Sequence, residues 1–227
     1  MLAEWENRDL HARAFDASYA FSQSTALRDI VAGRLDNVGR LVKYYSYRTV
    51  AYPRDAYKMT YVANHDLNSW EGTQFDLFGD ALDLAIVLSV VSDGIPLLYN
   101  GQEAGNEKML EFFEKDEIEW REHPVGELYR KLFELKHDTT ALWNGAAGAP
   151  MVRVFNSDLS HVFSFIREDE NGAVFAVFNI SPDTRTVTLA DSPANGDFTD
   201  FFSGEPVTIK EGTGLALQPW DYRVYIR

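Results

Sequence analysis

The chain has 227 residues, which by length is one large domain or one and a half, and 35 acidic against 21 basic residues give it a formal net charge of −14. This acidity argues against a nucleic-acid partner, because binding to a phosphate backbone requires clustered Lys and Arg. The absence of cysteine excludes disulfides and Cys-ligated metals. The longest apolar run, Leu82 to Val91, is too short to span a bilayer. We therefore expect a soluble chain with no membrane partner.

Up to about Trp143, short apolar runs alternate with amphipathic helical segments. The apolar runs predict strands over residues 1–3, 15–21, 59–63 and 95–99. Helices are expected over residues 24–34, 36–50, 76–92 and 125–138. Alternation of strands and helices is typical of βαβ units, so this part of the chain is predicted to be α/β with a parallel sheet.

After a turn-rich connector over residues 144–150, the pattern changes to short strands separated by turn clusters. Eight strands are expected, over residues 151–155, 161–167, 173–179, 185–189, 198–202, 207–209, 215–217 and 222–226. Strands at this spacing predict an antiparallel β-sandwich. We therefore divide the chain into an α/β unit over residues 1–145 and an all-β unit over residues 146–227.

Carboxylates follow two of the strands expected in the α/β unit. Glu4 follows residues 1–3, and Asp66, preceded by Asn64 and His65, follows residues 59–63. One carboxylate at a strand end is more often a helix cap or a surface charge than a catalytic group. In a parallel α/β barrel, however, the carboxyl ends of the strands meet in one mouth, and two carboxylates there suit glycosidic cleavage. The candidates for stacking on a sugar ring are Trp5, Trp70 and Tyr99.

The acidic stretch from Glu107 to Glu122 is the other concentration of charge, and it is typical of a solvated loop and helix. No metal ligands are predicted from the residues. Calcium stays open as a bound cation.

Three segments resemble the sequence signatures of the alpha-amylase superfamily of glycoside hydrolases. Residues 2–5 (LAEW) resemble its strand-five signature, which carries the general acid/base. Residues 61–66 (YVANHD) resemble the strand-seven signature, and residues 94–103 (GIPLLYNGQE) resemble the strand-eight signature G-x-P-x-x-Y-x-G-x-E. The order, the spacing and the trailing β domain agree with that family, so the resemblance covers essentially the whole chain.

The resemblance implies a fold and a role for each matching residue. The fold would be the second half of a (β/α)8 barrel, strands five to eight, followed by an antiparallel β-sandwich. Glu4 would be the general acid/base of a retaining hydrolase, and Asp66 the carboxylate that stabilises the transition state. His65 and Asn64 would bind the same sugar, and Trp5 would line the acceptor side. The implied substrates are α-linked glucans such as starch, glycogen and maltodextrins, or maltooligosaccharides.

The family's nucleophile is missing from this sequence. It is an aspartate in a strand-four motif G-x-R-x-D, which does not occur among the 227 residues. Without a nucleophile the covalent glycosyl-enzyme cannot form, so we expect a fragment that is inactive alone. The open edges of a half barrel would favour self-association.

A second interpretation is a non-catalytic carbohydrate-binding or scaffold module derived from the same family. Such a module would keep sugar-contacting residues such as His65 and Asp66, but it would tolerate the loss of Glu4. The linkage and the choice between hydrolysis and transfer stay open. The compartment also stays open, because any signal peptide would lie in a part that precedes this sequence.

Overall fold

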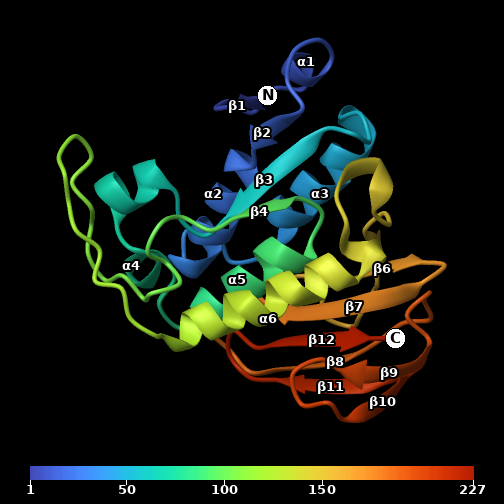
Figure 1. Ribbon diagram of the computed structural model, residues 1–227. Helices are drawn as coiled ribbons and strands as arrows, with labels where there is room; N and C mark the ends of the chain where they lie inside the picture. The colour runs from blue at the N-terminus through green and yellow to red at the C-terminus, as the bar shows by residue number, and fades with distance from the viewer.

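Parallel and antiparallel sheets follow one another in the computed structural model, which describes residues 1–227 (Figure 1). The first part contains β1 (Leu2–Ala3), α1 (Arg8–His11), β2 (Ala17–Tyr19), α2 (Phe21–Val31), α3 (Gly39–Ala51), β3 (Tyr57–Tyr61), η1 (Leu67–Glu71), α4 (Gln74–Phe78), η2 (Gly79–Ala81), α5 (Leu82–Val91), β4 (Ile95–Leu97), α6 (Pro124–Asp138), η3 (Thr140–Leu142) and η4 (Gly145–Ala147). The second part contains β5 (Val152–Arg153), β6 (Val162–Asp169), β7 (Gly172–Asn179), β8 (Arg185–Thr188), β9 (Gly196–Asp200), β10 (Pro206–Ile209), β11 (Gly214–Leu217) and β12 (Tyr222–Ile226). The expected order of α/β followed by antiparallel structure is confirmed.

The four strands of the first part form one parallel sheet in the order β1-β2-β3-β4. Because all four run in the same direction, their carboxyl ends lie along one edge of the sheet. The sheet does not close into a barrel, so β1 and β4 are both edge strands. Because the carboxyl ends of β1 and β3 lie on the same side of the sheet, the residues that follow these two strands lie near each other.

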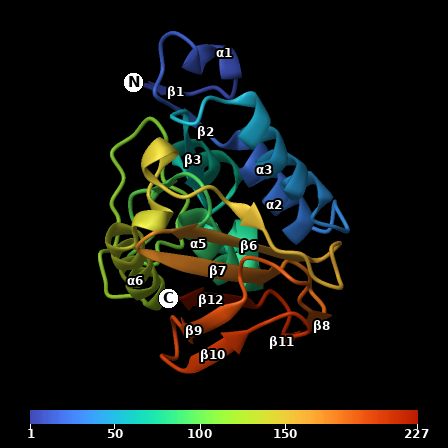
Figure 2. The same cartoon turned by 90° about the vertical axis from the view of Figure 1, so that its right-hand side faces the viewer.

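The strands of the second part form a six-stranded antiparallel sheet, β10-β9-β12-β7-β6-β5, and a two-stranded sheet, β11-β8. All eight expected strands are present, and the longest pair, β6 with β7, runs from Val162 opposite Asn179 to Asp169 opposite Gly172. Val177 of the larger sheet and Val187 and Leu217 of the smaller belong to one hydrophobic cluster. Figure 2 shows α2, α3 and α5 above β7, and the region of β8 to β11 below it.

Several helix limits differ from the expected ones. The helix expected over 76–92 is divided into α4 and α5, because Gly79 has a φ of +47° where α4 ends. Helix α2 begins at Phe21 rather than Ser24, and the Ser22 amide donates to the distant Glu6 carboxylate (2.6 Å). No helix forms between Glu107 and Glu122, where the helical part of the expectation was wrong.

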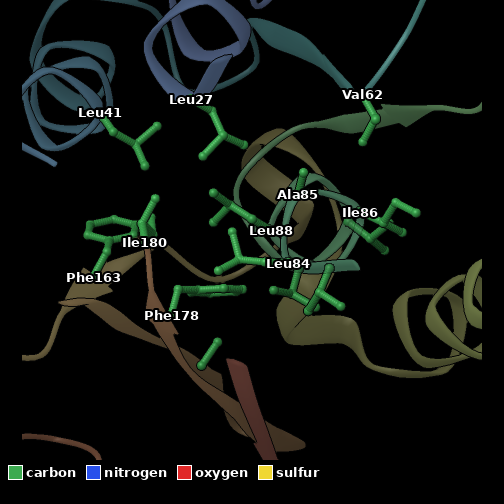
Figure 3. Packing of buried hydrophobic residues seen from close by; sticks show 14 of the residues in the cluster. Leu27, Leu41, Val62, Leu84, Ala85, Ile86, Leu88, Phe163, Phe178 and Ile180 are labelled. Atoms are coloured by element: carbon green, nitrogen blue, oxygen red, sulfur yellow. The ribbon is translucent and has the colours of Figure 1, made fainter. Parts of the chain in front are cut away.

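Helix α5 lies at the centre of the main hydrophobic core, and nine of its ten residues are buried, as a helix that is apolar on nearly every side requires. Leu84 and Leu88 of α5 lie among side chains from α2, α3 and the antiparallel sheet, including Phe163 and Phe178 (Figure 3). The core is therefore continuous across residue 145, and the domain boundary itself stays a prediction. None of the helices combines the length and hydrophobicity that a membrane crossing requires.

Two buried cations lie where the two parts meet, and one of them, Arg167, connects the antiparallel part to the first part. The Arg167 guanidinium of β6, 1% exposed, donates to the carbonyls of Ser92, Leu142, Trp143 and Ala149. Lys136 of α6 donates to the carbonyls of Val90 (3.2 Å) and Leu142 (2.7 Å). Burial, with a smaller contribution from the charge of Arg167, lowers the pKa of Lys136 to about 7. These donors satisfy carbonyls at the ends of α5 and η3.

Candidate active site

Three of the predicted site residues meet at the carboxyl edge of the parallel sheet. Glu4 directly follows β1, and His65 and Asp66 follow β3. The Nε2 atom of His65 lies 3.1 Å from Glu4 Oε1 and 3.6 Å from Asp66 Oδ1. All three side chains are accessible, with exposed fractions of 58% for Glu4, 39% for His65 and 51% for Asp66. The imidazole therefore joins two carboxylates that a solute can reach.

Asn64 and Trp5, the other predicted site residues, lie in contrasting environments. Asn64 is 2% exposed, and its Oδ1 atom accepts from the Leu67 amide (2.8 Å). This bond fixes the turn between β3 and η1, and so it orients His65 and Asp66, which lie within that turn. Trp5 is 67% exposed beside Glu4. The binding roles of both residues stay predictions.

Tyr19, at the end of β2, lies between the two carboxylate-bearing strands and was not predicted. Its ring is 7% exposed, stacks on Phe21 (5.2 Å between centroids) and meets Tyr61 edge-on (5.6 Å). Burial, followed by the charges of Glu4 and Asp66, raises the pKa of its hydroxyl. The strand expected over 15–21 ended too late, and this error concealed the strand-end position of Tyr19.

An aromatic platform, formed by Trp70, Phe112 and Phe113, extends the site on the His65 side. Phe112 lies 5.8 Å from the His65 ring and 5.5 Å from the Trp70 ring, and it meets Phe113 edge-on at 4.8 Å. Trp70 is 62% exposed and Phe113 83%. Trp70 was a sequence candidate, whereas the two phenylalanines lie within the acidic stretch and were hidden by its charge. Exposed rings of this kind provide flat apolar surface beside the polar groups.

The cluster of Glu4, His65 and Asp66 is a poor fit to calcium. Within residues 1–227, Glu4, His65 and Asp66 are the one group of three whose potential ligand atoms all lie within 4.8 Å of one another. Calcium takes roughly six to eight oxygen ligands, and an imidazole does not suit it.

Comparison with known proteins shows what the chain is similar to. No protein-family model matches the chain. It is 24% identical over 226 residues to Alpha-amylase 2 of Dictyoglomus thermophilum, and the match covers 94% of this chain and 37% of that protein. The chain is a partial-length relative of the alpha-amylases. The resemblance that the three motifs indicated is thus confirmed.

Solved alpha-amylase structures agree in fold. A noncanonic maltogenic alpha-amylase from Thermotoga neapolitana matches with a TM-score of 0.83 and 20% identity, over 99% of this chain and 53% of that one. An alpha-amylase from Geobacillus thermoleovorans, solved with acarbose, matches with a TM-score of 0.76 and 19% identity, over 100% of this chain and 53% of that one. The chain thus spans about half the length of these alpha-amylases, and less of the Dictyoglomus protein.

Proposed function

We propose that the chain is the C-terminal part of a retaining glycoside hydrolase that acts on α-linked glucans, with strands β1 to β4 as the second half of its barrel. The observation that supports this best is the convergence of Glu4 and Asp66 on His65, from strands separated by one neighbour in a parallel sheet. Paired carboxylates at the carboxyl end of parallel strands are what this chemistry requires.

In this proposal the two carboxylates have separate tasks. Glu4, in its protonated form, donates to the glycosidic oxygen as the bond to the leaving group breaks, and later accepts a proton from the attacking water. Asp66 stays ionised and stabilises the positive charge that develops on the sugar. His65 Nε2, within 3.6 Å of both, orients them and is available to bind a sugar hydroxyl.

The covalent step is the one for which this sequence offers no candidate. A retaining mechanism needs a nucleophile about 5 Å from the acid/base carboxyl group, and the G-x-R-x-D motif that would carry it is absent from these 227 residues. We therefore propose that the 227-residue chain binds maltooligosaccharides but does not cleave them.

Hydrolysis and binding by the purified 227-residue chain test this proposal together. A chromogenic maltooligosaccharide reports cleavage, and tryptophan fluorescence during maltotriose titration reports binding at the platform that contains Trp70. We expect no turnover, and binding that Asp66→Asn weakens by about tenfold through loss of a charge-assisted hydrogen bond. The matched control, Glu134→Gln, changes an exposed carboxylate of α6. Turnover that Glu4→Gln abolishes would refute the inactive-fragment proposal.

A carbohydrate-binding module is the second candidate, and the exposure of Trp70 and Phe113 favours it. A module holds sugar chiefly through ring stacking, so Glu4→Gln should leave its maltotriose affinity unchanged. In the hydrolase proposal Glu4 contacts the sugar, and the same variant binds several-fold more weakly. The Glu4→Gln titration thus separates the two candidates.

We also propose that the chain self-associates through the open edges of its parallel sheet. Strands β1 and β4 each have one unpaired edge, and Leu2 of β1 is 44% exposed. Unpaired edges and exposed apolar surface favour association. Light scattering should give a mass above that of one chain, whereas a monodisperse monomer that binds no hydrophobic dye would refute the idea.

A further inference from the structure

A cavity separate from the Glu4, His65 and Asp66 cluster lies between the segment after β1 and helix α3. Its volume is about 510 Å³, within the range of small-molecule sites. Arg8 borders it on one side, and Arg40, Lys43, Tyr47 and Arg48 of α3 border it on the other. None of the three candidate catalytic side chains lines it.

The only carboxylate in the cavity wall is already committed to neighbouring groups. One oxygen of Glu6 lies 3.4 Å from the ammonium of Lys58, which is fully buried and also lies over the ring of Tyr52 (3.8 Å). The other oxygen of Glu6 accepts from the Ser22 amide at the start of α2 (2.6 Å). The charge of Glu6 is therefore balanced by Lys58 and the Ser22 amide, and it repels an anion less than a free carboxylate would.

Positive charge is left over once the ion pairs at the wall are assigned. Arg48 pairs with Asp93, Arg40 shares Asp29 with Arg34, and Arg8 lies 3.3 Å from Asp9. The exposed Lys43 takes part in none of the ion pairs of the chain. The wall and the residues that pair with it thus hold six cationic side chains and four carboxylates. The cations are Arg8, Arg34, Arg40, Lys43, Arg48 and Lys58, and the carboxylates are Glu6, Asp9, Asp29 and Asp93. The local charge is positive on a chain whose net charge is −14.

We propose that this cavity binds a phosphate group, either free or carried on a sugar. Guanidinium and ammonium donors bind phosphate oxygens through charge-assisted hydrogen bonds, which Arg8, Arg40 and Lys43 are placed to give. Tyr47, 54% exposed and edge-on to Tyr52 at 6.3 Å, offers a ring face for a sugar that carries the phosphate. The cavity offers local positive charge on a chain that is acidic overall, so an anion is favoured there over the rest of the surface.

Calorimetric titration of the 227-residue chain at constant ionic strength tests the proposal. The probes are inorganic phosphate, glucose 6-phosphate and glucose. We expect binding of at least one phosphate compound and none of glucose alone. Equal affinity for both phosphate compounds would identify free phosphate as the ligand, and tighter binding of glucose 6-phosphate that Tyr47→Ala removes would identify a sugar phosphate.

Exposed lysines provide the matched pair of variants. Lys43→Gln should weaken phosphate binding by about tenfold, the loss of one charge-assisted contact, and Arg8→Gln should act in the same direction. Lys115→Gln removes an exposed lysine in the loop that carries Phe112 and should have no effect. Maltotriose binding should be unchanged in Lys43→Gln, so the outcome is independent of the proposed glucan site. Equal weakening by Lys43→Gln and Lys115→Gln, or no binding of either phosphate compound, would overturn the proposal.

Discussion

The carboxyl edge of the parallel sheet and the joint between α5 and the antiparallel sheet differ in how densely they are packed. Strands β1 to β4 are two to five residues long and carry the accessible Glu4 and Asp66 at their ends. Strands β6 and β7 are eight residues long, and their Phe165 and Phe178 are fully buried in the cluster that contains α5. Stability and the candidate chemistry therefore depend on different regions of this chain. Substitutions at the carboxyl edge should change the free energy of unfolding little, and substitutions at the joint should lower it strongly.

Arg167→Met should weaken the joint and cause the largest loss of unfolding free energy among these substitutions. It removes donors to four carbonyls in a dry environment, so we expect the free energy of unfolding to fall by about 4–5 kcal/mol. Chemical denaturation measures the loss. Arg130→Met, on the exposed face of α6, is the control and should cost less than about 1 kcal/mol. Similar losses in both variants would contradict the role of Arg167 as the connection between the two parts.

Phe178→Ala tests the apolar side of the same joint. Phe178 is fully buried in the main core beside α5, and its truncation leaves a cavity, so we expect a loss of about 3–4 kcal/mol in unfolding free energy. Phe113→Ala, which removes an equal number of atoms from a ring that is 83% exposed, should change stability by less than about 0.5 kcal/mol. If the two alanine variants unfolded at the same denaturant concentration, the contrast between joint and edge would be wrong.

Lys136, which bonds the Val90 and Leu142 carbonyls beside this joint, makes the stability of the chain depend on pH. Its pKa is about 7 in the folded chain against an ordinary value of 10.5, because burial disfavours the charged form. Between these values the unfolded chain holds one more proton on this residue than the folded chain, so the free energy of unfolding rises with pH, by about 1 kcal/mol per pH unit. Below about pH 7 both forms are protonated and this dependence disappears.

The measurement is urea unfolding of the original chain and of Lys136→Met across this pH range. The stability of the original chain should rise relative to that of the variant from about pH 7 upward. Parallel profiles would show that Lys136 stays protonated in the folded chain through its bonds to the Val90 and Leu142 carbonyls.

Sequence patterns predicted the strands, and the meeting of Glu4 and Asp66 at the carboxyl ends of the strands, better than the residues that support them. Glu4, His65 and Asp66 were found because they follow apolar runs directly, and the eight strands of the second part were found because turn clusters separate them. The start of α2 was misplaced because its first turn is capped by Glu6, 16 positions away. Phe112 and Phe113 were missed because they meet His65 and Trp70 only after the chain has folded, and no local pattern encodes such a contact.

The smallest expected effect comes from the edge itself and completes the contrast. Glu4→Gln and Asp66→Asn change accessible side chains, and the His65 imidazole is the one ion-pair partner of both carboxylates. Each substitution should therefore alter the free energy of unfolding by less than about 0.5 kcal/mol. Thermal unfolding followed by circular dichroism measures this, with Asn64→Ala as the contrasting variant. That residue is buried and bonds the Leu67 amide, so its loss should cost about 1–2 kcal/mol. A large loss of unfolding free energy in Glu4→Gln would mean that this carboxylate supports the fold, and it would contradict the proposal that Glu4 serves catalysis.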